Sequence, residues 1–81
     1  MTTLLESGLK RRTVVEIRRV LVEFDTLLSA EEVASILRIS NTTARTYLRR
    51  MAERGEVFEH RVSEGSRDIA AWRALRPDEA H

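Results

Sequence analysis

The 81-residue sequence contains no cysteine, one proline, three glycines and four aromatic residues. Without cysteine, neither a disulfide framework nor a thiolate metal site can form. The glycines are isolated at positions 8, 55 and 65, so the chain has no glycine-rich loop of the kind that cradles phosphates in nucleotide-binding enzymes. His60 and His81 have no partner at a metal-ligand spacing. We therefore expect no enzyme activity, no cofactor and no metal site.

Long hydrophobic runs are also absent, since no apolar stretch approaches the roughly 20 residues that cross a bilayer. The N-terminus lacks the continuous apolar segment of a signal peptide. We expect a cytoplasmic protein without membrane contact. The length suits one small domain with a thin core, because a chain of this size buries only about 60 to 65% of the surface that it exposes when unfolded.

The two signs of charge nearly cancel, with 14 basic and 13 acidic residues, but they are separated along the chain. Residues 10–19 and 38–54 each carry five basic residues against one acid, whereas residues 20–37 carry four acids and no base. Such segregation is expected when one surface faces a polyanion. Solvation of helix faces explains the charges equally well at this stage. The same alternative applies to the basic residues of 10–19, which could add phosphate contacts.

Apolar residues recur with the period of an amphipathic helix from Thr13 to Phe24. The residues expected to face inward are Val14, Ile17, Val20, Leu21 and Phe24. We interpret residues 1–12 as a tail or short arm. Ser29 and Glu32 then form an S-x-x-E capping box before a helix over Ala30–Leu37. In this second helix Val33, Ile36 and Leu37 are expected to face inward.

A third helix is predicted from a cap at Ser40 or Asn41 to about Arg54, and Gly55 follows where a left-handed residue is favoured. Residues 56–62 have strand-like composition, residues 63–67 form a turn around Gly65, and a second strand covers residues 68–75. The pattern predicts an α+β domain over residues 13–75, with three helices followed by a β-hairpin and a tail at 76–81. Trp72 is expected to pack the last strand on the helices.

The third helix has one apolar and one polar side. Its inward residues are Ala44, Tyr47, Leu48 and Met51, and its outward ones include Thr42, Arg45, Thr46 and Arg49. Threonine is a mediocre helix former, so solvation alone does not favour it there. Hydroxyls and an amide near a helix N-terminus, followed by arginines, suit contacts to base edges and phosphates in the DNA major groove.

The run SAEEVASILRISNTTARTYLRRMAERGEV, residues 29–57, resembles the helix-turn-helix core of winged-helix bacterial transcription regulators. The spacing of Ala34, Ile39, Ala44, Leu48 and Met51 carries the resemblance, and the Gly-x-Val at 55–57 resembles the start of the wing. Small regulators of fimbrial phase switching and the DNA-binding segment of citrate-type response regulators are similar, the latter in an S-x-x-T-A-R-x-Y-L run. Arg38 departs from the pattern, because such turns often have glycine there. Arg38 must either avoid a positive φ or accept about 1 kcal/mol of strain.

The resemblance implies a winged helix-turn-helix fold, a three-helix core followed by a β-hairpin wing, that binds double-stranded DNA. The DNA-binding residues would be Ser40, Asn41, Thr42, Thr43, Arg45, Thr46, Arg49 and Arg50 on the third helix and Arg61, Ser66 and Arg67 on the wing. A homodimer on two half-sites is possible through residues 3–9 or the first helix, and no small-molecule ligand is inferred. The alternative is a winged-helix module that binds another protein, because a fold alone does not fix function.

Overall fold

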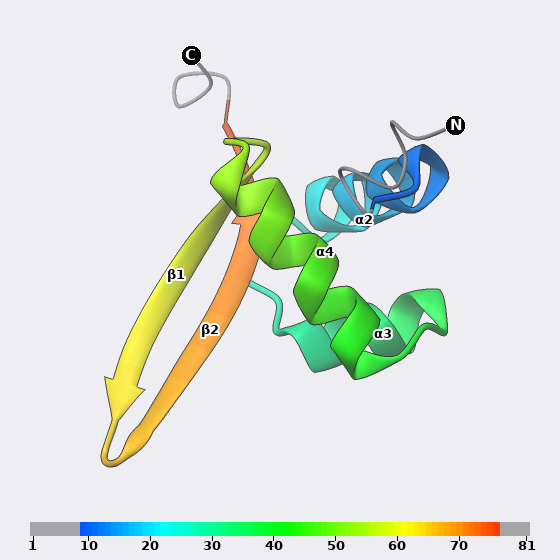
Figure 1. The fold of residues 1–81 in the computed structure, drawn as a ribbon. Coiled ribbons are helices and arrows are strands. Elements are labelled where there is room, and N and C mark those ends of the chain that lie inside the picture. The colour runs from blue at the N-terminus through cyan, green and yellow to red at the C-terminus, as the bar shows by residue number, and fades with distance from the viewer. Residues whose placement is uncertain (1–8, 77–81) are drawn as a thin grey trace.

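The computed structural model describes residues 9–76, which form three helices followed by one antiparallel hairpin (Figure 1). The elements in chain order are α2 (Arg11–Phe24), α3 (Ala30–Leu37), α4 (Asn41–Glu53), β1 (Val57–Glu64) and β2 (Arg67–Ala74). The predicted α+β class and element order are confirmed. In the part of the chain that is described, no helix is long and apolar enough to cross a membrane.

The first helix, α2, begins at Arg11, two residues before the predicted start. Its N-cap, Lys10, is extended, and the Lys10 backbone N–H donates a hydrogen bond of 2.9 Å to the hydroxyl of Tyr47 on α4. Leu9 is buried in the core. Residues 9–12, predicted as the end of a tail, are therefore part of the packed structure, while residues 1–8 lie outside the described residues.

The second helix, α3, has the predicted capping box. The Glu32 N–H donates to Ser29 Oγ at 3.1 Å, and the Ser29 N–H donates to the Glu32 carboxylate at 2.8 Å. The helix ends at Leu37, and its C-cap, Arg38, adopts the left-handed conformation with φ 59° and ψ 47°. Ile39 N–H closes the turn on the Ala34 carbonyl at 3.0 Å, as in a Schellman motif. Of the two possibilities left by the sequence, the positive φ is the one adopted.

The third helix, α4, is capped by Ser40, whose Oγ accepts from the Thr43 N–H at 3.0 Å. The helix ends at Glu53, and Arg54 is its C-cap. Gly55 follows with φ 76°, and the Glu56 N–H then bonds the Met51 carbonyl at 2.8 Å. The left-handed glycine predicted at this end is confirmed, and it directs the chain into β1.

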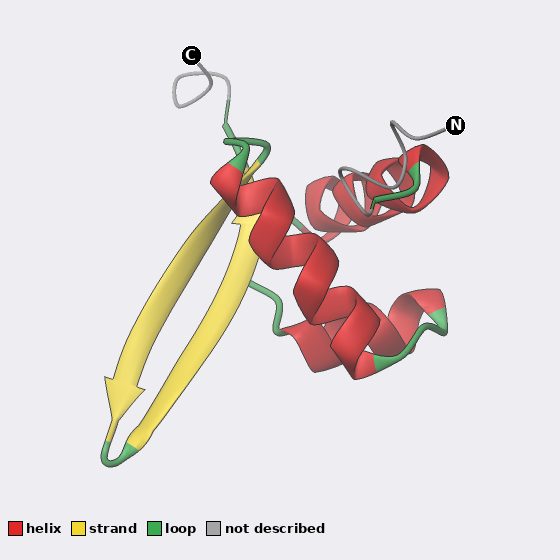
Figure 2. Cartoon of the chain, viewed as in Figure 1, coloured by secondary structure: helices red, strands yellow, loops and turns green. Residues whose placement is uncertain are grey.

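The turn of the hairpin is tighter than the sequence suggested, and the two strands pair closer to the tip (Figure 2). The predicted turn over residues 63–67 is wrong in extent, because Ser63 pairs with Asp68 and Glu64 with Arg67. Only Gly65 and Ser66 lie between the strands, and Gly65 has the positive φ of 65° that a two-residue hairpin turn requires. The strand pairing therefore continues almost to the tip.

A single rung joins the hairpin to the loop between α2 and α3. Leu28 and Trp72 exchange two backbone hydrogen bonds, each of 2.8 Å, so that Leu28 forms an isolated antiparallel bridge with β2. Both side chains are buried. The base of the hairpin is thereby fixed to the helices, whereas the residues beyond this rung extend away from them (Figure 1).

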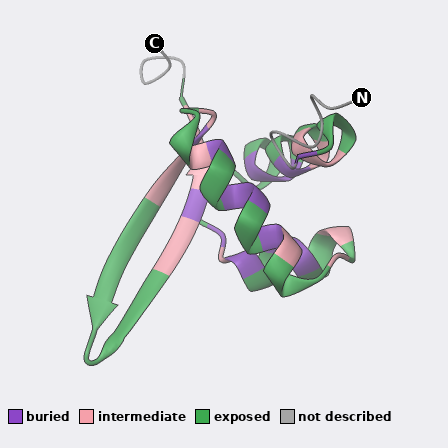
Figure 3. Cartoon of the chain, viewed as in Figure 1, coloured by how far each residue is buried: buried purple, intermediate pink, exposed green. Residues whose placement is uncertain are grey.

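The core lies where the three helices meet the base of the hairpin, and most of the hairpin beyond it is exposed (Figure 3). Ile17, Leu21, Val33, Leu48 and Met51 have no exposed surface. Trp72 is 2% exposed, which confirms its predicted place in the core.

Two residues predicted to face inward are exposed, Phe24 at 49% and Ile36 at 41%. Phe24 is the last residue of α2, where Asp25 turns the chain with φ 49°. On α3 the buried face is centred on Ala30, Val33 and Ala34, which leaves Ile36 at its edge. Periodicity indicated the direction of these side chains without showing whether another element covers them.

Candidate nucleic-acid interface

The two sides of α4 divide as predicted. Ala44, Tyr47, Leu48 and Met51 are buried against the rest of the domain. The exposed residues of the other side include Asn41, Thr42, Arg45, Thr46, Arg49 and Arg50. One amide, two hydroxyls and three guanidinium groups are therefore presented together on one element, with Glu53 as the one acid of α4.

Ser40 and Thr43 are engaged at the start of the helix. Besides accepting from the Thr43 backbone, Ser40 Oγ donates to Thr43 Oγ1 at 2.8 Å. Thr43 is also half-buried. These two predicted DNA-binding residues thus help to form the helix N-terminus. In the first two turns the side chains open to solvent are those of Asn41, Thr42, Arg45 and Thr46.

Arg45 and Arg49 have neither an ion pair nor a hydrogen-bonded partner among residues 9–76. Glu53, the one acid of α4, makes no ion pair with either arginine. Two guanidinium groups without an internal counter-charge are available to an external anion.

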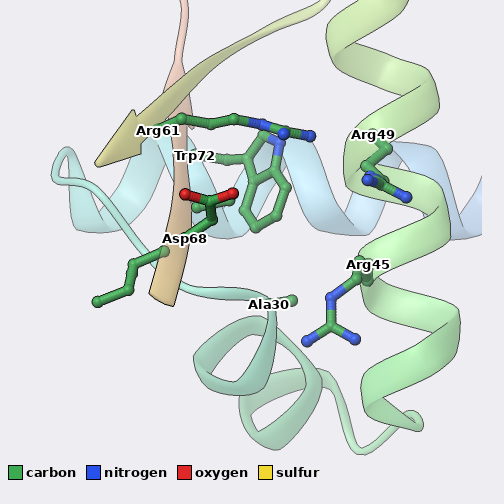
Figure 4. Close-up of a pocket in the computed structure, with 8 residues that line it drawn as sticks. Ala30, Arg45, Arg49, Arg61, Asp68 and Trp72 are labelled. Carbon is green, nitrogen blue, oxygen red and sulfur yellow. The ribbon is translucent and has the colours of Figure 1, made fainter. Parts of the chain in front are cut away.

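The side chains of Arg45 and Arg49 line a hollow of about 350 Å³ between α4 and the hairpin (Figure 4). Arg61 of β1 borders the hollow from the opposite side, together with Asp68, Ile69, Ala70 and Trp72 of β2 and with Ala30 at the start of α3. Three arginines against one aspartate make its lining basic.

Arg61 is held in place by a neighbouring acid. Its Nε–H donates to the Glu59 carboxylate at 2.7 Å. The hydrogen bond with Glu59, then the charge of Glu59 and more weakly that of Asp68, raises the pKa of Arg61 above its ordinary value. The guanidinium stays protonated, and its terminal nitrogens remain as further donors.

Trp72 contributes the one buried side-chain polar atom without a hydrogen-bond partner in the described residues, its indole Nε1. An unsatisfied buried donor costs about 1 to 3 kcal/mol relative to the same group in water. Trp72 and Arg61 lie on the same face of the hairpin, because Ala70 pairs with Arg61 and Trp72 follows two residues later. The uncompensated donor therefore belongs to a residue in the wall of the basic hollow.

The remaining predicted wing residues lie apart from Arg61. Ser66 is in the two-residue turn, and Arg67 pairs with Glu64 next to it. Since side chains alternate along a strand, Arg67 points to the opposite face of the hairpin from Arg61. The three residues therefore form two separate groups, Arg61 beside α4 and the other two at the tip.

The basic residues of α2 are partly paired within the protein. Arg18 donates to Glu56 at 2.8 Å, which ties α2 to the segment after α4. Arg12 lies 3.8 Å from Glu16 on the same helix. These two pairs account for part of the charge cluster in residues 10–19, and α2 has no place in the lining of the hollow.

Sequence reasoning missed Asp68, Ile69 and Trp72 as residues of a common site with Arg45 and Arg49. The signal that could have found them is the hairpin register. A two-residue turn at Gly65 and Ser66 places Arg61 and Trp72 on one face. The assumed five-residue turn obscured that register.

A scan against models of known protein families finds no match for this chain, and a search of the curated proteins finds none. Within residues 9–76 no three histidine or carboxylate side chains are grouped so that they could hold a metal ion. Functional interpretation therefore rests on the geometry of α4 and the hairpin.

Proposed function

We propose that the protein binds double-stranded DNA sequence-specifically and acts as a transcription regulator. In this proposal the fold is a winged helix-turn-helix, with α3 and α4 as the helix-turn-helix pair and the hairpin as the wing. The helix α4 enters the major groove, and the hairpin contacts the flanking DNA.

The observation that carries this proposal is the solvent-exposed side of α4. It presents Asn41, Thr42, Thr46 and arginines together, and Arg45 and Arg49 have no acidic partner in the described chain. Amide, hydroxyl and guanidinium groups are the side-chain groups that bind base edges and phosphates. A face built only for solubility needs neither threonines nor uncompensated arginines.

The dimensions of α4 also support this function. Its 13 residues form a helix about 20 Å long, and the major groove is about 12 Å wide, enough to admit an α-helix. The helix packs on the core through one side only, which leaves the other side accessible along its length.

The test is selection of bound duplexes from a random oligonucleotide pool, followed by affinity measurements on the selected site. We expect a defined consensus, and we expect the Arg45→Ala/Arg49→Ala double variant to bind it at least tenfold more weakly. Arg19→Ala is the matched control for the removal of a positive charge, because Arg19 is exposed on α2 and does not line the hollow. Unchanged binding by the folded double variant would contradict the proposal.

The symmetry of the selected sites reports on dimerisation. A palindrome with half-sites about 34 to 36 Å apart would indicate a dimer. Leu9 is buried in its own domain, so it is not part of a dimer contact in this arrangement. Retention of a stoichiometric protein partner, with no DNA bound at low salt, would instead favour the protein-binding alternative.

A further inference from the structure

We propose that the hollow between α4 and the hairpin seats a backbone phosphate of the bound DNA, held by Arg45, Arg49 and Arg61. This inference rests on the proposed function and assigns separate roles within it. Arg45 and Arg49, which line the hollow, hold the sugar-phosphate strand, while Asn41, Thr42 and Thr46, which do not line it, read the bases.

Charge is the first feature of the hollow that favours a phosphate. Arg45 and Arg49 border the hollow from α4, and Arg61 borders it from β1 (Figure 4). Their like charges repel one another, and an anion placed among them offsets that repulsion. The guanidinium group presents a planar fork of N–H donors that matches a phosphate in two-point contact.

The acids around the hollow are already engaged. Glu59 accepts the Nε–H of Arg61 at 2.7 Å, and the Asp68 carboxylate accepts from Ser63 Oγ at 2.9 Å. The bond to Glu59 fixes Arg61 while leaving the terminal nitrogens of its guanidinium for a ligand. Arg45 and Arg49 form no ion pair or hydrogen bond with either acid. The three arginines thus exceed the single Asp68 in the lining, and a singly charged phosphodiester balances part of the excess.

The indole nitrogen of Trp72 is the second feature, a buried donor without an acceptor in a side chain that is 2% exposed. Figure 4 shows Arg61 extending over the indole toward α4, and both residues line the same hollow. A phosphate oxygen bound between Arg61 and Arg49 would be an acceptor for the indole N–H. A donor kept without a partner in the wall of a basic hollow points to a ligand with free oxygens.

Size and place are the third feature. About 350 Å³ holds a phosphodiester with its sugar, and Ala70 and Ala30 supply apolar wall for the sugar. One wall of the hollow is α4 itself. If α4 occupies the major groove, the DNA strand that borders the groove on the hairpin side passes between α4 and the hairpin, where the hollow lies. A backbone phosphate of the duplex is therefore the expected occupant.

The test separates phosphate contacts from base contacts by salt dependence. Each of the variants Arg45→Ala and Arg49→Ala should weaken binding to the selected duplex and to a scrambled duplex by the same factor. Each variant should also make the fall of log K with log salt less steep by up to about 0.9, the value for one phosphate that is no longer neutralised. Thr42→Ala and Thr46→Ala should change base preference at defined positions and leave the slope unchanged, and Arg19→Ala should alter neither quantity.

A series of duplexes, each with one phosphate replaced by a neutral methylphosphonate, tests the same contact directly. At one position in the half-site this replacement should weaken wild-type binding about tenfold, yet have little further effect on the Arg45→Ala/Arg49→Ala variant. If every single substitution weakens both proteins equally, the inference is wrong. It is also wrong if Arg45→Ala relaxes base preference without changing the salt slope. In both cases duplex binding persists, so the proposed function stands, whereas the absence of duplex binding by the wild type rejects both.

Trp72 is the only tryptophan and reports on the hollow directly. Its fluorescence should change on binding the selected duplex, and the same change should be reduced in Arg61→Ala. Inorganic phosphate at millimolar concentration should compete only weakly. Tight binding of inorganic phosphate that the duplex cannot displace would assign the hollow to a small phosphorylated ligand and overturn the inference.

Discussion

At the scale of single residues, the backbone at the ends of the helices is the most constrained feature. Each of the three described helices is followed within two residues by a left-handed residue, namely Asp25, Arg38 and Gly55. Glycine adopts this conformation without a steric penalty, and aspartate tolerates it better than most residues. Arginine has neither advantage, so Arg38 carries strain that the other two positions avoid.

Replacing Arg38 with glycine should therefore stabilise the protein. The left-handed conformation costs an L-residue about 1 kcal/mol, and the greater freedom of glycine in the unfolded chain takes back part of the gain. We expect a net increase of roughly 0.5 kcal/mol in the free energy of unfolding, measured by urea denaturation. Ser35→Gly, an exposed interior position of α3, should instead destabilise by about 0.5 kcal/mol. A lower stability for Arg38→Gly would show that its side chain has a structural role.

The Tyr47 hydroxyl is the second residue-scale feature, because it accepts the backbone N–H of Lys10 at 2.9 Å and so links α4 to the start of α2. Tyr47→Phe leaves that part-buried N–H without its acceptor. We expect a decrease of about 1 kcal/mol in unfolding free energy, together with faster amide exchange at Lys10. Hydrogen exchange measured by NMR tests the second expectation, and unchanged exchange at Lys10 would contradict it.

At the scale of elements, α3 is the piece that depends most on its cap. Eight residues are too few for a helix to be stable on its own in water, so packing and capping must hold it. Val33 and Ala34 supply the packing, and the reciprocal bonds of Ser29 and Glu32 satisfy two backbone donors at its start.

Ser29→Ala should accordingly destabilise the protein by about 1 to 2 kcal/mol. The substitution removes the acceptor of the Glu32 N–H, and it weakens the reciprocal hydrogen bond from the residue 29 N–H to the Glu32 carboxylate. Ser35→Ala, on the same helix but outside the cap, should be neutral or slightly stabilising. Thermal unfolding of the two variants makes the comparison, and equal midpoints would mean that the cap contributes nothing measurable.

The sequence predicted the elements well because their signals are local. The capping serines, Gly55 and the periodicity of α2 each depend on residues within one or two turns. Phe24 and Ile36 were mispredicted because burial depends on what another element covers, which no local pattern contains. The positive φ of Arg38 was similarly undecided, since it runs against the intrinsic preference of an arginine backbone.

The candidate site was predicted only in its local part. The exposed side of α4 followed from helical geometry alone. Its relation to Arg61, Asp68 and Trp72 depends on the hairpin register and on the Leu28–Trp72 bridge, which joins the hairpin to a loop far from it in the sequence. A misjudged turn of a few residues was enough to hide this grouping.

At the scale of the whole molecule, the packed helices and the outer part of the hairpin differ in burial. The core ends at the base of the hairpin, and β1 and β2 are exposed from His60 to Ile69 (Figure 3). Stability therefore depends on the helices and the base of the hairpin, whereas the outer strands are free to contact a partner.

Shortening the hairpin tests this division. Deleting Ser63, Glu64, Arg67 and Asp68 keeps the Gly65–Ser66 turn and preserves the faces of the strands, because two whole pairs are removed. We expect the unfolding free energy to change by no more than about 0.5 kcal/mol, since all four residues are exposed. Because the deletion also removes Asp68, which lines the hollow, Arg67→Ala measures the contribution of the tip to binding: duplex affinity should fall, with a salt slope less steep by about 0.9 if Arg67 neutralises one phosphate.

Thermal unfolding and duplex titration at several salt concentrations measure the two effects. A large decrease in stability would show that the tip supports the core. Full retention of affinity and slope would remove the tip, with Ser66 and Arg67, from the proposed interface.

The Leu28–Trp72 rung gives the hairpin the mechanics of a beam clamped at one end. A small rotation of the strands at the Leu28–Trp72 bridge becomes a large displacement of the Gly65–Ser66 turn, while a change at the turn has little effect on the bridge. Repacking around Leu28 would therefore change the direction of the hairpin tip. In the proposed complex, residues that do not touch the DNA would in this way alter how the hairpin follows the curvature of the duplex.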